Sequence, residues 1–460
     1  MPTPHRDRAL DTDDLVERCA EDGRGTDTTG LGLEVEAFVL ATDPIRRIPV
    51  EGADSLLTTL GGSDGVWSPA PSASPLTADG WRSAAPGSPR ISFEPGGQLE
   101  VSTSYATDPH RAFDDVSVQL AGLADVLGER GWHLVPVGND RWRPGTVPQQ
   151  LSGPRYPAMD ASFARRSPAG RTMMRDTCAL QLNLDLGTGA EAEARWLVTN
   201  LLAPVAVAAF ACSPGDARDG DYRSTRQRTW QQLDPTRTGC VLPAADATAT
   251  ISEQWQRFAL NAEVLFVTDD DGSHAVDPGW RFGDWMREGH PRFGWPTRED
   301  LARHLTTLFP EVRPRGYLEV RSIDAVPVRW REAITALYLG AVYDVRARDR
   351  ILDVLTGRPR SLSEQLASAA ERGVADAAWC ATAVEVWAYA LEGAWRLTPT
   401  LLDAAACRDA ESLLDAYTVR GRCPGDELAL RHRRDGARAA LRWAAEPTTT
   451  HRPVPQEACR

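Results

Sequence analysis

Acidic and amide side chains alternate with apolar ones in four short segments of this sequence. Residues 33–38 read LEVEAF and residues 98–102 read QLEVS. Residues 177–186 read TCALQLNLDL and residues 317–321 read YLEVR. Because successive side chains of a β-strand point to opposite faces, each segment is predicted to be a strand with its acids and amides on one face.

The polar faces of these strands hold side chains that could do chemistry. An antiparallel sheet with one face in water shows the same alternation, and for any single strand that is the simpler interpretation. Together the segments favour a functional face, because Glu, Gln and Asn are poor strand formers. In addition, Glu34 and Glu36 would repel each other without a cation. Carboxylate and phosphate oxygens are the ligands that Mg²⁺ prefers, so the pattern predicts magnesium ions around a triphosphate.

An arginine-rich segment is the second candidate. Residues 222–239 contain four arginines and a tryptophan: Arg223, Arg226, Arg228, Arg237 and Trp230. Guanidinium groups bind phosphates and carboxylates through paired hydrogen bonds. All 51 basic residues of the chain are arginine, which excludes a Walker A loop, a kinase β3 lysine and a pyridoxal phosphate Schiff base. The segment is therefore the best candidate for a triphosphate clamp, although a solvated basic turn has the same composition.

The composition is that of an ordinary globular protein. The chain has 460 residues, of which 42% are hydrophobic and 25% charged, and its formal net charge of −13 argues against a general nucleic-acid binder. The apolar stretch 196–212 is too short to span a bilayer and is predicted to be a buried helix. The eight cysteines have no metal-binding spacing and the N-terminus has no apolar signal region. A cytoplasmic location with free thiols is expected.

Strand patterns are concentrated before residue 325, and helical spacing dominates residues 328–445. This order predicts an α+β fold rather than regular βαβ alternation. Within the second part, four ranges are predicted to be helices: 331–345, 361–372, 375–394 and 426–444.

The expected organisation is a single catalytic domain over residues 29–445. A polar, partly helical lead-in precedes it over residues 1–28, and a flexible tail follows it over 446–460. Residues 52–90 are rich in Gly, Ser and Pro and are expected to form a loop excursion. The DDDG sequence at 269–272 is expected to be a hairpin turn, and His304 to have a surface or packing role.

Several segments, in order, resemble one enzyme family. They are residues 32–36 (GLEVE), 92–102 (SFEPGGQLEVS), 154–174 (PRYPAMDASFARRSPAGRTMM), 181–185 (QLNLD), 230–239 (WQQLDPTRTG) and 304–324 (HLTTLFPEVRPRGYLEVRSID). From about residue 30 to 325 the chain is similar to glutamate–cysteine ligases of the second, plant and bacterial, group. GLEVEA followed by DPIRR at 43–47 resembles the actinobacterial branch that supplies γ-glutamylcysteine for ergothioneine.

The resemblance implies a curved antiparallel sheet that forms an active-site funnel and is wrapped by helices. It also implies a ligase that uses ATP and Mg²⁺ to join the γ-carboxylate of glutamate to the amino group of cysteine through γ-glutamyl phosphate. The expected partners are the small molecules glutamate, cysteine and ATP, with no nucleic acid and no membrane.

Motif positions also imply roles for individual residues. The expected magnesium ligands are Glu34, Glu36, Glu100, Gln181 and Glu319. The expected phosphate-binding residues are Arg226, Arg237 and Arg321, and those expected to act in catalysis are Arg321, Arg237 and Glu319. Substrate is expected to contact Trp230, Arg226, Asn183 and Gln98. Glu94 is expected near the site but not as a direct ligand.

Two other functions stay open at this point. A sister carboxylate–amine ligase would use a different amine or acid. A catalytically silent nucleotide-binding protein would bind ATP without turnover, but such a protein could lose its acidic positions freely, and here they are intact.

Overall fold

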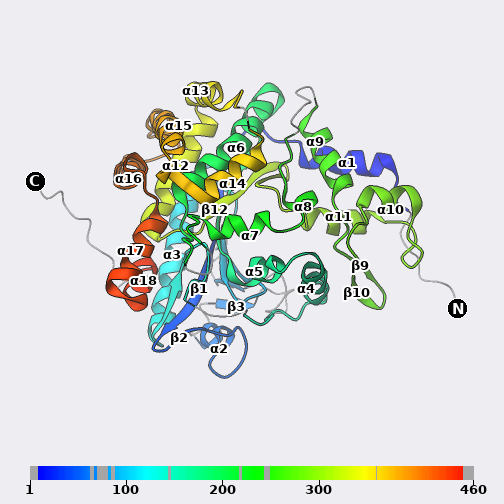
Figure 1. Ribbon diagram of the computed structural model, residues 1–460, viewed down its shortest axis with the longest axis horizontal. Helices are drawn as coiled ribbons and strands as arrows, with labels where there is room; N and C mark the ends of the chain where they lie inside the picture. Colours follow the sequence, from blue (N-terminus) through cyan, green and yellow to red (C-terminus); the bar gives the residue numbers. More distant parts are fainter. Residues whose placement is uncertain are drawn as a thin grey trace, which may run out of the picture.

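Strand β1 (Leu31–Thr42) organises the fold of the computed structural model shown in Figure 1. The structure describes residues 9–62, 67–69, 81–83, 89–142, 147–216, 220–242, 249–358 and 360–448. The other strands of the main sheet are β2 (Ile45–Arg47), β3 (Trp67–Pro69), β4 (Trp81–Ser83), β5 (Arg90–Phe93), β6 (Leu99–Ser102), β7 (Trp132–Val135), β8 (Ala179–Asp185), β11 (Val312–Pro314) and β12 (Tyr317–Asp324).

These strands form a 10-stranded antiparallel sheet in the order β11-β12-β8-β1-β6-β5-β4-β3, with β2 and β7 also paired to β1. The N-terminal half of β1 lies between β6 and β8, and its C-terminal half pairs with β2 and β7. The four segments with alternating acids become β12, β8, β1 and β6, which are consecutive neighbours in the sheet. The predicted strands and the α+β class are therefore confirmed.

Helices surround this sheet. They are α1 (Thr12–Asp22), α2 (Leu56–Gly61), α3 (Pro109–Gly128), α4 (Arg155–Arg166), α5 (Ala169–Asp176), α6 (Gly189–Phe210), α7 (Thr225–Gln231), α8 (Pro235–Thr238), α9 (Ile251–Asn261), α10 (Phe282–Glu288), α11 (Arg298–Thr306), α12 (Val328–Tyr343), α13 (Val345–Leu355), α14 (Leu362–Arg372), α15 (Ala377–Arg396), α16 (Ala404–Ala416), α17 (Pro424–Asp435) and α18 (Ala437–Ala444). Figure 1 shows α12, α13, α15 and α16 gathered at one end of the molecule, and α1, α9, α10 and α11 at the other.

Helix α6 connects the sheet to the helical part. It is buried along most of its length and packs against β12 and α14, which confirms the predicted buried helix. Apolar side chains of β1, β8 and β12 belong to the same hydrophobic cluster as those of α6 and α12. Because this side of the sheet is filled, the polar side is left to line a site. In the part of the chain that the structure describes, no helix is long and apolar enough to cross a membrane.

Three predicted segments differ from the structure. The helix expected over 426–444 is two helices, because Gly436 between α17 and α18 has a positive φ of 84°. The helix expected over 331–345 begins at Val328 and ends at Tyr343, and Asp344 then caps α13 by accepting a hydrogen bond from the Ala347 amide at 2.8 Å. The loop expected over 52–90 contains α2, β3 and β4 among its described residues.

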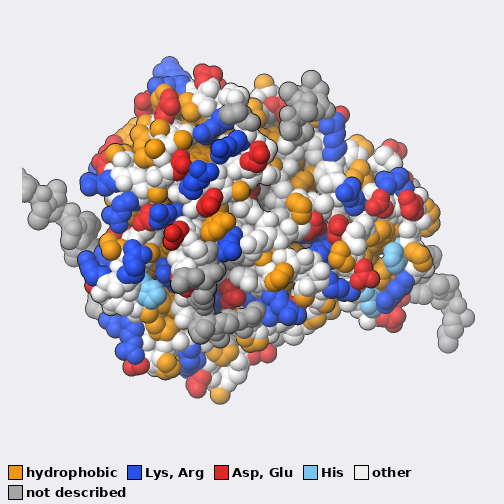
Figure 2. All heavy atoms as spheres, viewed as in Figure 1, with side chains coloured by type: hydrophobic (Ala, Val, Ile, Leu, Met, Phe, Trp, Pro, Cys, Tyr) orange, Lys and Arg blue, Asp and Glu red, His pale blue; other side chains and the backbone are white. Residues whose placement is uncertain are grey.

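The hairpin predicted at DDDG is confirmed, since it joins β9 (Phe266–Asp269) to β10 (Gly272–Ala275). At the expected tail, Glu446 is not free: its carboxylate accepts a hydrogen bond from Arg331 at 2.7 Å, while residues 449–460 lie outside the described residues. Figure 2 shows basic and acidic side chains interspersed over one face of the molecule.

Candidate active site

The strand register brings the predicted acids to one side of the sheet. Glu36 on β1 lies opposite Glu100 on β6, and Glu34 lies opposite Gln181 on β8. Glu319 on β12 lies opposite Asn183 on β8. Side chains at paired positions share a face, so four strands contribute polar groups to one surface.

This surface lines a cavity of about 290 Å³. Its acidic residues are Glu34, Glu36, Glu94, Glu100 and Glu319. Its arginines are Arg90, Arg155, Arg313, Arg315 and Arg321. Its apolar lining includes Met159, Met173, Trp230, Phe266 and Phe309. The cavity therefore combines carboxylates, guanidinium groups and an apolar wall.

Three carboxylates converge at one end of the cavity. Glu36, Glu94 and Glu100 each offer one oxygen, and these oxygens lie within 4.8 Å of one another. Burial raises the pKa of each of the three carboxyl groups, and the charge of Glu94 further raises the pKa of Glu36 and of Glu100. Arg155 and Arg321 partly offset the effect of burial on the pKa of Glu94. A hard divalent cation takes several oxygen ligands and would remove this repulsion, so the donor set fits Mg²⁺.

Glu34 shares this environment. Its side chain accepts a hydrogen bond from the Asn183 amide at 3.0 Å. Burial, followed by repulsion from Glu100 and Glu319, raises the pKa of Glu34 to about 7. Without a cation, the folded protein therefore resists ionising this carboxyl group at neutral pH.

Glu319, at the other end of the row, has the opposite balance. Arg313 donates to both oxygens of its carboxylate, with the Nη2–Oε1 contact at 2.9 Å. Arg315 lies 3.3 Å and Arg321 3.6 Å from the same group. Burial opposes the charge, but the three guanidinium groups lower the pKa of Glu319 to about 2. At this end of the cavity, three arginines therefore surround one ionised carboxylate, and the local charge is positive.

Gln181 connects the two ends. Its amide nitrogen donates to Glu36 at 3.0 Å, and its amide oxygen accepts from Arg321 at 2.7 Å. The Arg321 guanidinium also lies beside a pair of rings that contact each other, 5.9 Å from the Trp230 centroid and 5.6 Å from the Phe309 centroid. Arg321 is therefore held from two sides while it lines the cavity.

Two predicted substrate residues line or border the cavity. Gln98 donates from its amide nitrogen to the Thr177 carbonyl at 2.9 Å, whereas its buried amide oxygen has no hydrogen-bond partner among the described residues. The indole nitrogen of Trp230 is buried and equally without a partner within the described chain. Both atoms could bind a polar substrate group.

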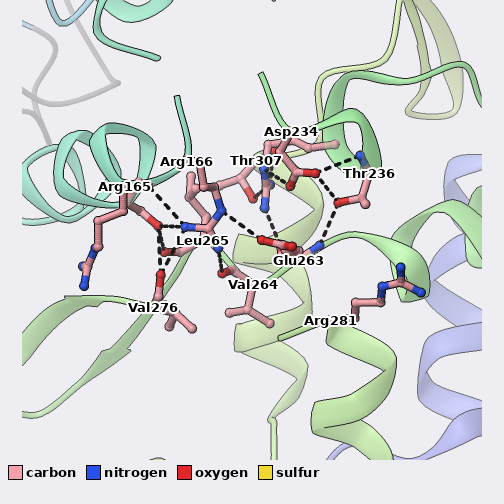
Figure 3. A network of polar contacts seen from close by, with 12 residues as sticks. Arg165, Arg166, Asp234, Thr236, Glu263, Val264, Leu265, Val276, Arg281 and Thr307 are labelled. Carbon is pink, nitrogen blue, oxygen red and sulfur yellow. Dashed lines mark hydrogen bonds and ion pairs between the residues drawn. The ribbon is translucent and has the colours of Figure 1, made fainter. Parts of the chain in front are cut away.

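Arg226 and Arg237 lie behind the cavity rather than on its wall. Arg226 is 3% exposed and donates to the main-chain carbonyl of Arg321 at 2.8 Å. Arg237 is fully buried and donates to Thr307 Oγ1 at 2.9 Å and to the Glu263 carbonyl. Figure 3 shows the polar network around Asp234, Thr236, Glu263 and Thr307. The structure thus brings the predicted acids together with Arg321, while Arg226 lines a small adjoining cavity with Trp230 and Arg321, and Arg237 lines neither.

His304 is a packing residue in the structure, as predicted. It is buried, its Nε2 lies 2.9 Å from the Ala259 carbonyl, and its ring stacks on Phe282 at 4.4 Å. Burial, together with the charge of Arg237, lowers the pKa of His304 to about 3. The seven cysteines that the structure describes are all free.

Sequence reasoning captured only part of the cavity. It expected Glu94 near the site but not as a direct ligand, and it named neither Arg313 nor Arg155. Arg313 lies on β11, which is only three residues long. Arg155 begins α4, where an exposed arginine is ordinary. All three lie inside motifs that carry the family resemblance, and this was the only available signal for them.

Comparisons with known proteins show the family of the chain. Residues 30–455 match glutamate–cysteine ligase family 2 (GCS2). The chain is 32% identical over 408 residues to a glutamate–cysteine ligase, EgtA, from Mycobacterium tuberculosis strain H37Rv, covering 87% of this chain and 85% of that relative. It is 30% identical to a chloroplastic glutamate–cysteine ligase from Medicago truncatula, covering 75% of this chain and 67% of the relative. A solved glutamate–cysteine ligase from Francisella tularensis in complex with AMP matches with TM-score 0.49 and 12% identity, covering 92% of this chain and 89% of that one.

Proposed function

The chain belongs to glutamate–cysteine ligase family 2, and we propose that it is an ATP-dependent ligase that joins glutamate to cysteine. The observation that carries the proposal is the cavity in which Glu36, Glu94 and Glu100 converge within 4.8 Å. Arginines line the same cavity. Binding a nucleoside triphosphate for phosphoryl transfer requires carboxylates that hold metal cations. It also requires guanidinium groups that bind the phosphate oxygens.

The proposed reaction has two steps. The γ-carboxylate oxygen of glutamate attacks the γ-phosphorus of ATP, the bond to the β-phosphate oxygen breaks, and ADP leaves. The amino nitrogen of cysteine then attacks the acyl carbon of γ-glutamyl phosphate, phosphate leaves with the bonding electron pair, and the nitrogen loses a proton. The products are γ-glutamylcysteine, ADP and phosphate, and no protein nucleophile is needed.

Magnesium is part of this proposal. Glu34, Glu36, Glu94 and Glu100 would hold it, and when bound it supplies positive charge that offsets the repulsion between phosphates and carboxylates. Glu319 faces Arg313, so we propose that its first task is to orient that guanidinium group. Gln181 and Glu319 complete the predicted ligand set, although the amide oxygen of Gln181 already accepts a hydrogen bond from Arg321.

The arginines have distinct proposed roles. Arg321 and Arg313 line the cavity and would bind the anionic phosphates or the substrate carboxylates. Arg226 bonds the main chain of Arg321 and Arg237 bonds Thr307, which lines the cavity, so these two arginines would position the wall rather than bind ATP. Gln98 and Trp230 would contact glutamate or cysteine, with Asn183 orienting Glu34.

The wider context is proposed on the same basis. We expect a cytoplasmic protein whose product feeds ergothioneine synthesis, as the branch resemblance implies. We also propose that residues 29–445 form one catalytic domain. In support, one hydrophobic cluster includes residues from Leu10 to Ala444.

The test is a coupled assay of ADP release with glutamate and cysteine, with and without Mg²⁺, and mass detection of the dipeptide. Magnesium-dependent ADP release and γ-glutamylcysteine are expected. Glu36→Gln should abolish both, whereas Glu17→Gln, on the exposed surface of α1, should leave them unchanged. ADP release with another amine but not with cysteine would favour the sister ligase, and ATP binding without turnover would favour the silent relative.

A further inference from the structure

The DPIRR motif at residues 43–47 distinguishes the branch that this chain resembles, but the proposed reaction gives it no task. Its last residues form β2, which pairs with the end of β1. Alternation along β2 leaves Arg46 exposed, while Arg47 is only 6% exposed. A buried arginine usually signals a specific set of acceptors, because burying an unpaired charge is costly.

Arg47 has such a set of acceptors. Its Nε donates to Asp140 Oδ2 at 2.7 Å, and the side chain of Asp140 is fully buried. Its Nη1 donates to the Gly96 carbonyl at 3.1 Å, and its Nη2 to the Arg175 carbonyl at 3.1 Å. The guanidinium carbon lies 4.1 Å from the ring centroid of Phe38 on β1. The planar, forked guanidinium group can donate to all three acceptors at once, whereas the ammonium group of a lysine cannot.

The two main-chain carbonyls that accept from Arg47 belong to the segments that precede two strands of the site. Gly96 is in the turn between β5 and β6. Glu94 lies two residues before Gly96, and Gln98 lies two residues after it. This turn is closed by the Glu94 amide donating to the Gln98 carbonyl at 2.8 Å. Arg175 is near the end of α5, just before β8, which carries Gln181.

The turn and the end of α5 are also in tight contact. A Cβ atom on Gly96 would lie 2.2 Å from the Arg175 carbonyl oxygen, so only glycine permits this approach. Gln150 supports the turn from another side, because its amide nitrogen donates to the Gly96 carbonyl at 2.8 Å. Arg47 therefore acts at the junction where the Glu94 turn meets the start of β8.

We propose that Arg47 is a positioning residue for the cation site, which fixes the turn of Glu94 against β8 so that Glu94 meets Glu36 and Glu100. The inference rests on the proposed function, since it assumes that these carboxylates bind a divalent cation. Arg47 itself does not line the cavity. Groups that hold metal ligands in place typically alter metal affinity by about 10- to 100-fold when they are replaced.

The experiment compares Arg47→Lys with Arg46→Lys, its exposed neighbour on the same strand. Mn²⁺ is the probe, and its binding to the metal-free protein without substrates is measured by the EPR signal of free Mn²⁺. Arg47→Lys is expected to raise the Kd for Mn²⁺ about 10-fold or more, and Arg46→Lys to leave it unchanged. In the ADP assay, Arg47→Lys should require more Mg²⁺ for half-maximal rate and recover most of its kcat at saturating Mg²⁺.

A folded Arg47→Lys protein with the wild-type Kd for Mn²⁺ would overturn the inference. If that variant does not fold, Gln150→Met tests the same turn, because it removes the second bond to the Gly96 carbonyl and Gln150 lies outside the cavity wall. It should also raise the Kd, and an unchanged value would count against the proposal. Wild-type protein that binds Mn²⁺ but makes no dipeptide refutes the ligase activity alone, whereas wild-type protein that makes the dipeptide but binds no Mn²⁺ refutes the role of Arg47 alone.

Discussion

Replacing Glu34 by glutamine is expected to stabilise the metal-free protein while it weakens activity. Glu34 lines the cavity, and burial, with repulsion from Glu100 and Glu319, raises its pKa from 4.5 to about 7. Glutamine keeps an amide oxygen that can accept the bond from Asn183, now 3.0 Å long. The substitution therefore removes a disfavoured charge and retains the hydrogen bond.

The expected gain in the free energy of unfolding, and its pH dependence, follow from the pKa values of Glu34 in the unfolded and folded states. Below pH 4.5 the carboxyl group is protonated in both states and has no effect on the free energy of unfolding. As pH rises, the unfolded chain loses this proton first, so stability falls until the folded protein also ionises near pH 7. One pKa unit corresponds to about 1.4 kcal/mol, so the loss amounts to about 3 kcal/mol at pH 8 and about 1 kcal/mol at pH 5.5. Glu34→Gln should raise the free energy of unfolding by these amounts at the two pH values.

The assay is urea unfolding in EDTA at pH 8 and pH 5.5, followed by tryptophan fluorescence. Glu319→Gln is the matched control, because it removes one negative charge from the same cavity. Arg313, Arg321 and Arg315 hold the pKa of Glu319 at about 2 against the effect of burial. Its ionised form therefore stabilises the fold, and Glu319→Gln should lower the free energy of unfolding by about 3 kcal/mol at pH 8.

Opposite signs for the two variants are the central expectation. The reasoning would be refuted if Glu34→Gln destabilised the metal-free protein at pH 8. It would also fail if the gain did not shrink at pH 5.5, since the pKa shift would then not be its source. Equal changes in both variants would indicate that only the net charge of the cavity matters.

Three further predictions concern other buried groups. Mn²⁺ affinity measured by EPR should fall as pH is lowered from 8 to 6, because protons compete for carboxylates such as Glu36 and Glu100, whose pKa values burial and mutual repulsion raise. Burial lowers the pKa of His304 from 6.5 to about 3, so stability is present above pH 6.5 and is lost below it. In urea unfolding, this loss should be about 2 kcal/mol at pH 5 and absent in His304→Gln. Asp324→Ala should destabilise the protein by about 3 kcal/mol in the same assay, because the buried carboxylate accepts bonds from the Cys212 amide at 2.9 Å and from Ser213 at 2.6 Å.

The strands that carry the site could be predicted because alternation is a local property. Residues 33–37 and 98–102 alternate with period two, and residues 33–37 and 99–102 lie in β1 and β6. Their pairing could not be predicted, because Glu36 and Glu100 are opposite each other only through contacts across the fold. The convergence of Glu94 with Glu36 and Glu100 could not be predicted for a related reason: a turn whose Gly96 carbonyl accepts bonds from Arg47 and Gln150 places Glu94.

The arginines show where residue type stops being informative. Arg226 and Arg237 have the spacing of a phosphate clamp, yet both donate to main-chain carbonyls behind the cavity. Arg313, on the three-residue strand β11, was not among the expected arginines, yet it makes the bidentate contact with Glu319. A guanidinium group can donate to main-chain carbonyls as well as to carboxylates, so only the fold decides which of them it meets.

The two ends of the cavity explain why one sheet face carries acids and arginines together. The arginines nearest β12 are committed to Glu319, which they keep ionised. Among the described residues, Glu36 and Glu94 have no arginine within 4.0 Å of their carboxylates, and Arg90 lies 4.0 Å from Glu100. If arginines neutralised every acid, no site for a cation would remain, and if none were present, nothing would hold an anion. The uneven pairing leaves one end ready for divalent cations and the other for anionic oxygens, and a metal-bound triphosphate has both.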